Sequence, residues 1–225
     1  MPHLDITLDF ETLSLLPTAA PVKLAAVAWS RNEPLDLAKL ASESFSVSFD
    51  VRDAIAEGLS IDQSTLTWWS TQDPSVKRSV LKSGTLLDIA DAMSTFLGWI
   101  DGAKTRYNAE TVTIWAQGSD FDISILRNLM HIAHLDEDFK KLVPYLCLRD
   151  ARTLVLELGK TLVNFKLSDA PIPGKSIYSA IDSASSFEQE MKHLKAHDPY
   201  KDCIRTTVSV YTVLHSLDGK DTYIS

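Results

Sequence analysis

The spacing of apolar and polar residues predicts three strands in the first fifty residues. Residues 4–10 and 44–50 alternate between apolar and polar side chains, as a half-buried strand does. Residues 22–29 form a nearly continuous apolar stretch after a turn that is bounded by prolines. Because short connections join the three segments, we expect them to pair as an antiparallel meander.

The second half of the pattern alternates strands with helices. Residues 86–100 place their apolar side chains at helical spacing, and residues 121–130 do the same. Residues 111–116 and 144–149 are typical of strands, and a helix is expected over residues 151–158. This alternation implies parallel crossovers. We therefore predict an α/β fold with a mixed five-stranded sheet and helices on both sides.

Two further helices and one irregular segment complete the pattern. Residues 62–72 are predicted to be helical, and Asp198 followed by Pro199 marks the start of a last helix. Residues 160–186 contain prolines, glycine and small residues without a clear period, which indicates a long loop or insertion. We find no internal repeat or linker, so residues 1–225 are expected to form a single domain.

Composition restricts the class of protein. The chain has 225 residues, 45% of them hydrophobic, but no apolar run approaches the roughly 18 residues of a membrane span. The first residues lack the basic start of a signal peptide, so we expect a soluble, cytoplasmic protein without a membrane partner. Cys147 and Cys203 lie among apolar residues and are predicted to be free thiols.

The charge balance limits how nucleic acid could be bound. The net charge is −8, from 30 acidic and 22 basic residues. This argues against a protein that coats nucleic acid, because such binding depends on Lys and Arg neutralising phosphates. It does not exclude a site at which bound cations supply the positive charge.

One pair of acidic residues has the spacing of neighbours on a strand face. Asp9 and Glu11 end the first predicted strand, and residues two apart on a strand point to the same side. Alone, such a pair is more typical of a solvated strand end. Asp122 starts a helix behind a strand and Asp202 lies in the first turn of the last helix, so both can reach the same patch. Carboxylates gathered in this way repel unless a cation lies between them, and oxygen ligands favour Mg²⁺ or Mn²⁺ over Zn²⁺.

A histidine precedes an aspartate by five residues three times in the chain. The pairs are His131 with Asp136, His193 with Asp198, and His197 with Asp202. Asp198 is better used as the cap of the last helix, and the first pair is interpreted as solvated surface. The pair of His197 and Asp202 remains as the candidate for chemistry.

Taken in order, three segments resemble the motifs of the DnaQ-like 3′-to-5′ exonucleases of the DEDDh class. The segments are Asp9-Phe10-Glu11-Thr12, Phe121-Asp122 and residues 197–202. Residues 65–72 and 148–153 further resemble the phage exodeoxyribonuclease A branch and its bacterial exoribonuclease relatives. The resemblance implies a ribonuclease H-like fold and, for a phage-encoded chain, a place in the host cytoplasm.

The resemblance also implies a mechanism and a cofactor. It makes four carboxylates the ligands of two Mg²⁺ or Mn²⁺ ions, namely Asp9, Glu11, Asp122 and Asp202. His197 would be the general base, and Glu11 would belong to the catalytic residues as well as to the metal ligands. The implied reaction hydrolyses phosphodiester bonds and releases nucleoside 5′-monophosphates.

Residues near the first motif are candidates for substrate binding. In the family, the segment after that motif contacts the terminal nucleotide, which points to Thr12 and Leu13, although Leu13 could equally serve packing. Trp68 and Trp69 diverge by about 100° on a helix, so one is expected in the core. We assign Trp69, together with Gln72, to base stacking, but the sequence leaves open whether Trp68 or Trp69 contacts the substrate.

Further candidates flank the second motif and the fifth predicted strand. Many family members carry Asn where this chain has Gly118, so Ser119 could replace that contact or cap the helix. Asp120 is a rival to Asp122 as a ligand. The two arginines around Asp150 could hold substrate phosphate or pair with that carboxylate; they are Arg149 and Arg152.

The expected substrate is a single-stranded nucleic acid 3′ end, with DNA favoured over RNA. An exoribonuclease that trims RNA is the first alternative, because the fold accepts either sugar. A catalytically silent nucleic-acid-binding module of the same fold is the second. The sequence leaves the oligomeric state open, a homodimer included.

Overall fold

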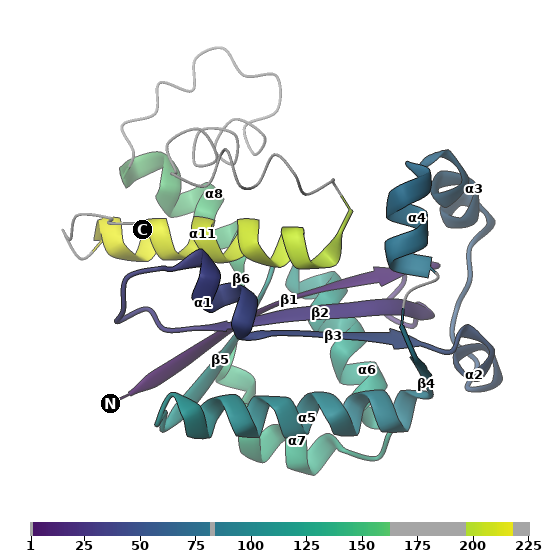
Figure 1. Cartoon of the computed structure of the whole chain (residues 1–225), viewed down its shortest axis with the longest axis horizontal. Coiled ribbons are helices and arrows are strands. Elements are labelled where there is room, and N and C mark those ends of the chain that lie inside the picture. The colour runs from purple at the N-terminus through teal and green to yellow at the C-terminus, as the bar shows by residue number, and fades with distance from the viewer. Residues whose placement is uncertain (1, 82–83, 163–196, 218–225) are drawn as a thin grey trace.

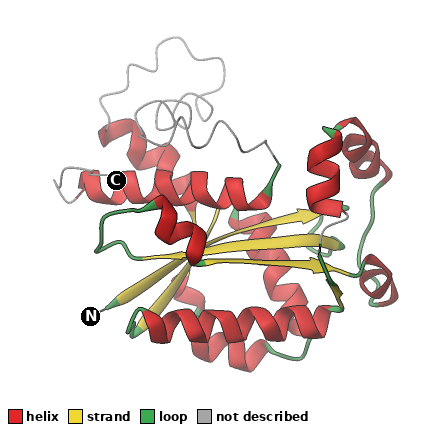
Figure 2. Ribbon diagram, in the orientation of Figure 1, coloured by secondary structure: helices red, strands yellow, loops and turns green. Residues whose placement is uncertain are grey.

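A six-stranded sheet between two layers of helices forms the centre of the protein (Figures 1 and 2). The computed structural model describes residues 2–81, 84–162 and 197–217, so the predicted irregular segment lies outside the described residues from position 163 onward. The strands are β1 (His3–Thr12), β2 (Pro21–Trp29), β3 (Ser44–Phe49), β4 (Leu86–Leu87), β5 (Thr111–Ala116) and β6 (Leu148–Asp150). The α-helices are α1 (Leu37–Ser42), α2 (Val51–Ala56), α3 (Gln63–Thr71), α4 (Pro74–Leu81), α5 (Ile89–Arg106), α6 (Ser124–Ile132), α7 (Asp136–Leu142), α8 (Ala151–Leu162) and α11 (Pro199–Leu217).

The strand order confirms the predicted mixed sheet, with one strand more than expected. The order is β4-β3-β2-β1-β5-β6. β1, β2 and β3 form the predicted antiparallel meander, and β1, β5 and β6 are parallel to one another. The additional strand β4 pairs with β3 in parallel, and its residues were expected to start the helix over 86–100. That helix begins later because the Asp88 side chain accepts a hydrogen bond from Asp91 N and caps it.

Several short elements differ from the sequence pattern. The fifth expected strand is reduced to β6, because residues Tyr145–Cys147 form a 3₁₀ turn. The helices α1, α2 and α7 were not predicted. Each has only six or seven residues, which is too short for a helical period to show.

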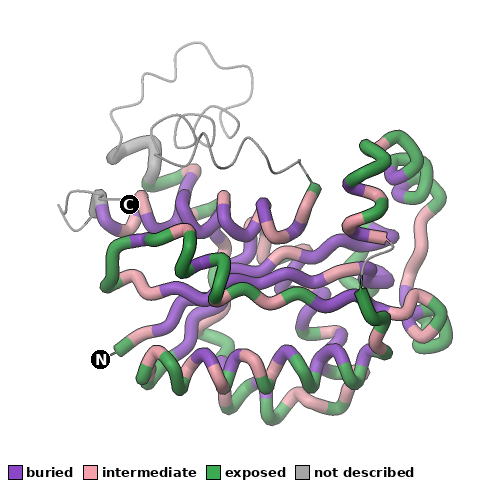
Figure 3. The backbone as a smooth tube through the Cα atoms, viewed as in Figure 1, coloured by how far each residue is buried: buried purple, intermediate pink, exposed green. Residues whose placement is uncertain are grey.

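Each face of the sheet is covered by its own apolar cluster. One cluster joins β2 and β5 to α1, α8 and α11, and the other joins the opposite face to α5, α6 and α7. The strands β1, β2 and β5 are buried almost throughout, whereas β3, β4 and β6 and the outer sides of helices such as α5 are partly exposed (Figure 3). None of the described helices is long and apolar enough to cross a membrane.

A buried ion pair holds the start of β1. Asp5 has no exposed surface, and its two oxygens accept hydrogen bonds from Arg31 Nε at 2.8 Å and Nη2 at 2.5 Å. Trp115 Nε1 donates a further bond at 2.8 Å. Burial alone would raise the pKa of Asp5, but the hydrogen bonds from Arg31 and His3 outweigh it and keep the pKa below its usual value. This network joins β1 to β5 and to the end of β2.

Asp5→Ala should therefore destabilise the protein by about 3 to 5 kcal/mol, because it leaves the arginine without its buried partner. Lys140→Ala, which breaks an exposed pair with Glu137, is the control and should change the free energy of unfolding by less than about 1 kcal/mol. Urea denaturation of both variants measures the difference. Equal effects of the two substitutions would contradict a structural role for the buried pair.

Candidate active site

The first two carboxylates lie on the face of β1 that packs against α11. Thr7, on the same face, bonds through its hydroxyl to Thr207 Oγ1 of α11 at 2.9 Å. Asp9 and Glu11 follow at the strand period, opposite Ala25 and Lys23 of β2. Glu11 is only 8% exposed, and Asp9 is half-buried. The strand pattern thus places the pair side by side, as predicted.

Asp122 reaches the same strand from a π-helical turn. Residues Ser119–Ile123 form this turn, in which Gly118 O accepts bonds from both Phe121 N and Asp122 N at 3.1 Å. π-turns are rare and occur often at functional sites. Asp122 Oδ1 accepts a bond from Phe10 N at 3.0 Å, so its carboxylate lies against the segment between Asp9 and Glu11. Of the two candidate aspartates, Asp120 is exposed, whereas Asp122 is buried and faces β1.

The start of α11 contributes a carboxylate and an imidazole. Asp198 accepts a bond from Tyr200 N at 3.1 Å and acts as the predicted cap. Asp202 follows in the first turn, half-buried. His197 is exposed and has a left-handed backbone with φ of 63°, which turns the chain directly before the helix. Ligand atoms of Glu11, His197 and Asp202 all lie within 4.8 Å of one another.

Burial opposes the ionisation of all four carboxylates, and for Asp9 and Glu11 the neighbouring carboxylates add electrostatic repulsion. Burial, followed by the charges of Asp202 and Asp122, raises the pKa of Glu11 to about 9. Burial raises the pKa of Asp122 to about 7, although the bonds from Phe10 and Gly118 act against it. Burial and neighbouring carboxylates raise the pKa of Asp9 well above its usual value, and burial also raises that of Asp202. A divalent cation would remove this repulsion, and the oxygen donors fit Mg²⁺ or Mn²⁺.

The loop that follows β1 is fixed by hydrogen bonds. Thr12 Oγ1 donates to Ser14 O at 2.6 Å, and Thr12 O accepts from Trp69 Nε1 at 2.9 Å. Leu13 is 8% exposed, and its carbonyl accepts from Asp62 N at 2.8 Å. The structure therefore places both residues beside Glu11, with much of each side chain engaged in the fold.

The exposure of the two adjacent tryptophans is the reverse of what the assignment of Trp69 to base stacking requires. Trp69 is 3% exposed and packs in the core, so its ring faces are covered and not available to a base. Trp68 is 38% exposed and lies in edge contact with His197. Gln72 is half-buried and donates to Trp68 O at 3.2 Å. The hydrophobic periodicity could not decide which of the two is buried, because either tryptophan can lie on the apolar face of the helix.

Hydrogen bonds to Asp150 connect the start of the π-helical turn with the start of α8. Asp150 accepts bonds from Ser119 N at 2.8 Å and from Thr153 N at 2.6 Å. In the described part of the chain, neither Arg149 nor Arg152 forms an ion pair with it. Arg149 bonds to the carbonyl of Leu146, and the guanidinium of Arg152 lies beside Gly118. The Ser119 side chain does not cap the π-turn, which has Gly118 at its cap position.

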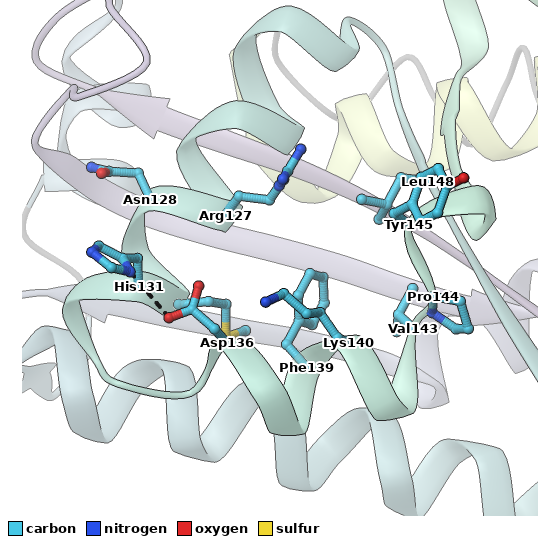
Figure 4. Close-up of a pocket in the computed structure, with 11 residues that line it drawn as sticks. Arg127, Asn128, His131, Asp136, Phe139, Lys140, Val143, Pro144, Tyr145 and Leu148 are labelled. Atoms are coloured by element: carbon cyan, nitrogen blue, oxygen red, sulfur yellow. Dashed lines mark hydrogen bonds and ion pairs between the residues drawn. The ribbon is translucent and has the colours of Figure 1, made fainter.

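A cavity of about 710 Å³ lies away from the carboxylates, between α6, α7 and the start of β6 (Figure 4). His131 and Asp136 lie at its rim, joined by a bond of 3.1 Å. The side chain of His131 is 77% exposed and that of Asp136 is 37% exposed, which agrees with the interpretation of this pair as solvated surface. The cavity contains none of the predicted site residues.

Two features of the site were not expected from the sequence. Lys23 lies opposite Glu11, and its charge lowers the glutamate's pKa against the larger effect of burial. Its ammonium group donates to Ser79 O at 2.8 Å and ties α4 to β2. The contact between Trp68 and His197 is the second feature. The register of β1 and β2 would have indicated Lys23, whereas nothing in the sequence pairs residues 68 and 197.

Comparison with known proteins agrees with this geometry. A family model described as 3′-5′ exoribonuclease Rv2179c-like domain matches residues 4–192. The chain is also 24% identical over 236 residues to a protein named exodeoxyribonuclease from Enterobacteria phage T4, covering 96% of this chain and 92% of the relative. The family match spans most of the chain, including β1 and the π-turn. The chain therefore belongs to the 3′-5′ exoribonuclease Rv2179c-like domain family and is a 3′-to-5′ exonuclease.

Proposed function

We propose that this single-domain exonuclease hydrolyses single-stranded 3′ ends at the carboxylate site, with two Mg²⁺ or Mn²⁺ ions. Asp9, Glu11, Asp122 and Asp202 would hold the ions. The observation that carries the proposal is the convergence of Glu11, His197 and Asp202 within 4.8 Å beside the buried Asp122. Bound ions of this kind lower the pKa of a water molecule and stabilise the leaving oxygen.

His197 is the proposed general base. It is exposed, and its ring nitrogens lie within reach of Glu11 and Asp202, where a water molecule bound at the carboxylates would also lie. A neutral imidazole can take the proton of that water as it attacks the terminal phosphodiester. Glu11 would orient the water through its carboxylate while it binds the cation.

Several residues are proposed to bind the substrate strand. Thr12 and Leu13 border the carboxylates, and the exposed ring of Trp68 takes over the stacking role first assigned to Trp69, with Gln72 beside it. The backbone of Ser119 and the guanidinium groups of Arg149 and Arg152 would contact the strand near the π-turn. The positive charges of these two arginines would offset the net negative charge of the chain where the strand binds.

The site favours catalysis over a silent binding module. A module without catalysis would have no need for four carboxylates whose pKa is raised by burial at a cost in stability. DNA is the preferred substrate in this proposal, because the phage exodeoxyribonuclease aligns over nearly the whole chain. The family description favours RNA as the second candidate.

DNA and RNA oligomers of equal sequence, each labelled at the 5′ end, should be shortened from the 3′ end at different rates. We expect the larger kcat/KM for DNA, with nucleoside 5′-monophosphates as products. Chelation by EDTA should stop both reactions, and Mg²⁺ or Mn²⁺ should restore them. A larger kcat/KM for RNA would replace the preferred substrate by the second candidate.

Asp122→Asn should lower the rate of hydrolysis by more than about 100-fold, since changes to groups that only support metal ligands already cost 10- to 100-fold. The amide keeps the acceptor for Phe10 N, so the fold should be preserved. Asp120→Asn is the matched control, two residues away and exposed, and should keep its activity. Similar activity in the two variants would contradict the ligand assignment.

Without divalent ions, the protein should lose stability as the pH rises. The pKa of Glu11 is about 9 in the fold and 4.5 in an exposed chain, so the folded state keeps a proton that the unfolded state releases. The free energy of unfolding should therefore fall as the pH rises from about 5 to 9. Thermal unfolding in EDTA measures this slope. Glu11→Gln should flatten the slope, and Mg²⁺ should raise Tm more at pH 9 than at pH 6.

A further inference from the structure

We propose that Trp68 is a positioning residue for His197 and holds its imidazole over Glu11 and Asp202. The inference rests on the proposed role of His197 as the general base. It assigns to the exposed tryptophan a second role, distinct from stacking against a base.

The contact between the two rings has the geometry of an aromatic pair. The ring centroids of Trp68 and His197 are 4.7 Å apart, and the ring planes are inclined by 89°. Perpendicular arrangements bring the electron-poor edge of one ring against the electron-rich face of another. In the described part of the chain, no hydrogen bond orients the imidazole of His197. Among the described residues, the indole ring of Trp68 is therefore the group that can orient the imidazole of His197.

Trp68 is itself anchored to the strand that carries the carboxylates. Its ring lies 5.0 Å from that of Trp69, at 75°. Trp69 is buried, and its Nε1 donates to Thr12 O at 2.9 Å, directly after Glu11. The two tryptophans thus form a chain of contacts from the end of β1 to the histidine before α11. Because this chain starts beside Glu11, it places the imidazole relative to that carboxylate.

The backbone of His197 gives a reason for such a support. A left-handed conformation is unfavourable for a residue with a side chain, and His197 adopts it with φ of 63°. The residue is also exposed, so packing against the core does not hold its ring. The contact with Trp68 of α3 therefore restricts the position of the imidazole, which the burial of His197 itself does not.

Kinetics can separate positioning from base stacking. Trp68→Leu should lower kcat about 3- to 10-fold, the loss expected from one aromatic contact, in addition to the rise in KM that the loss of base stacking produces. Trp68→Phe, which keeps an aromatic ring, should recover most of the lost kcat. Leu66→Ala is the matched control, because Leu66 lies on the same helix and is also 38% exposed. A rise in KM with kcat retained would overturn the inference and leave Trp68 as a stacking residue.

A spectroscopic measurement tests the contact without any reaction. In ¹H–¹³C spectra at one fixed pH, the ring-proton signals of His197, assigned through His197→Gln, should shift in Trp68→Leu. They should stay near the wild-type position in Leu66→Ala, and the signals of the distant, exposed His131 should not move.

The two readouts distinguish failure of the inference from failure of the proposed function. A wild-type protein without hydrolytic activity would refute the proposed function, while the spectra would still report the contact. In an active enzyme, unmoved His197 signals in Trp68→Leu would overturn the inference. Shifted signals with an unchanged kcat would overturn it as well, because the contact would then not position the base.

Discussion

The burial of several carboxylates at one place is the constraint around which this structure is organised. Asp9, Glu11, Asp122 and Asp202 come from three elements that are far apart in the sequence. Burial makes the ionisation of each one costly, and repulsion from the neighbouring carboxylates adds to this cost for Asp9 and Glu11. The pairing of β1 with β2 and β5 fixes the strand that carries these two residues.

The ends of β1 illustrate two ways of burying a carboxylate on one strand. Asp5 is paired with Arg31 and bonded to Trp115, so its charge is compensated within the protein. Glu11, six residues later on the same face, has Lys23 opposite it, and the lysine's ammonium group also bonds to Ser79 O. The carboxylate at one end of the strand is therefore compensated within the protein, while burial raises the pKa of the carboxyl group at the other end to about 9.

The sequence predicted the three-stranded meander and the mixed sheet, but not the two-residue strand β4 or the shortness of β6. Strand alternation fixes which side chains share a face, so Asp9 and Glu11 were predictable together, and the Asp-Pro cap placed Asp202 in the first turn of α11. The assignment of Trp69 was not reliable, because two adjacent helical residues of one type carry no signal about which is buried. The contact of Trp68 with His197 depends on the meeting of α3 and α11, which no local pattern encodes.

The hydrogen bond from Phe10 N to Asp122 has a consequence for the proposed metal site. Oδ1 already accepts a bond from the backbone of β1, so one of its lone pairs is not available to a cation. In the proposed site, this strand amide would therefore limit how the carboxylate of Asp122 can turn toward an ion. The same amide would fix the direction from which a cation approaches, so the backbone of β1 takes part in defining the coordination geometry without supplying a ligand atom.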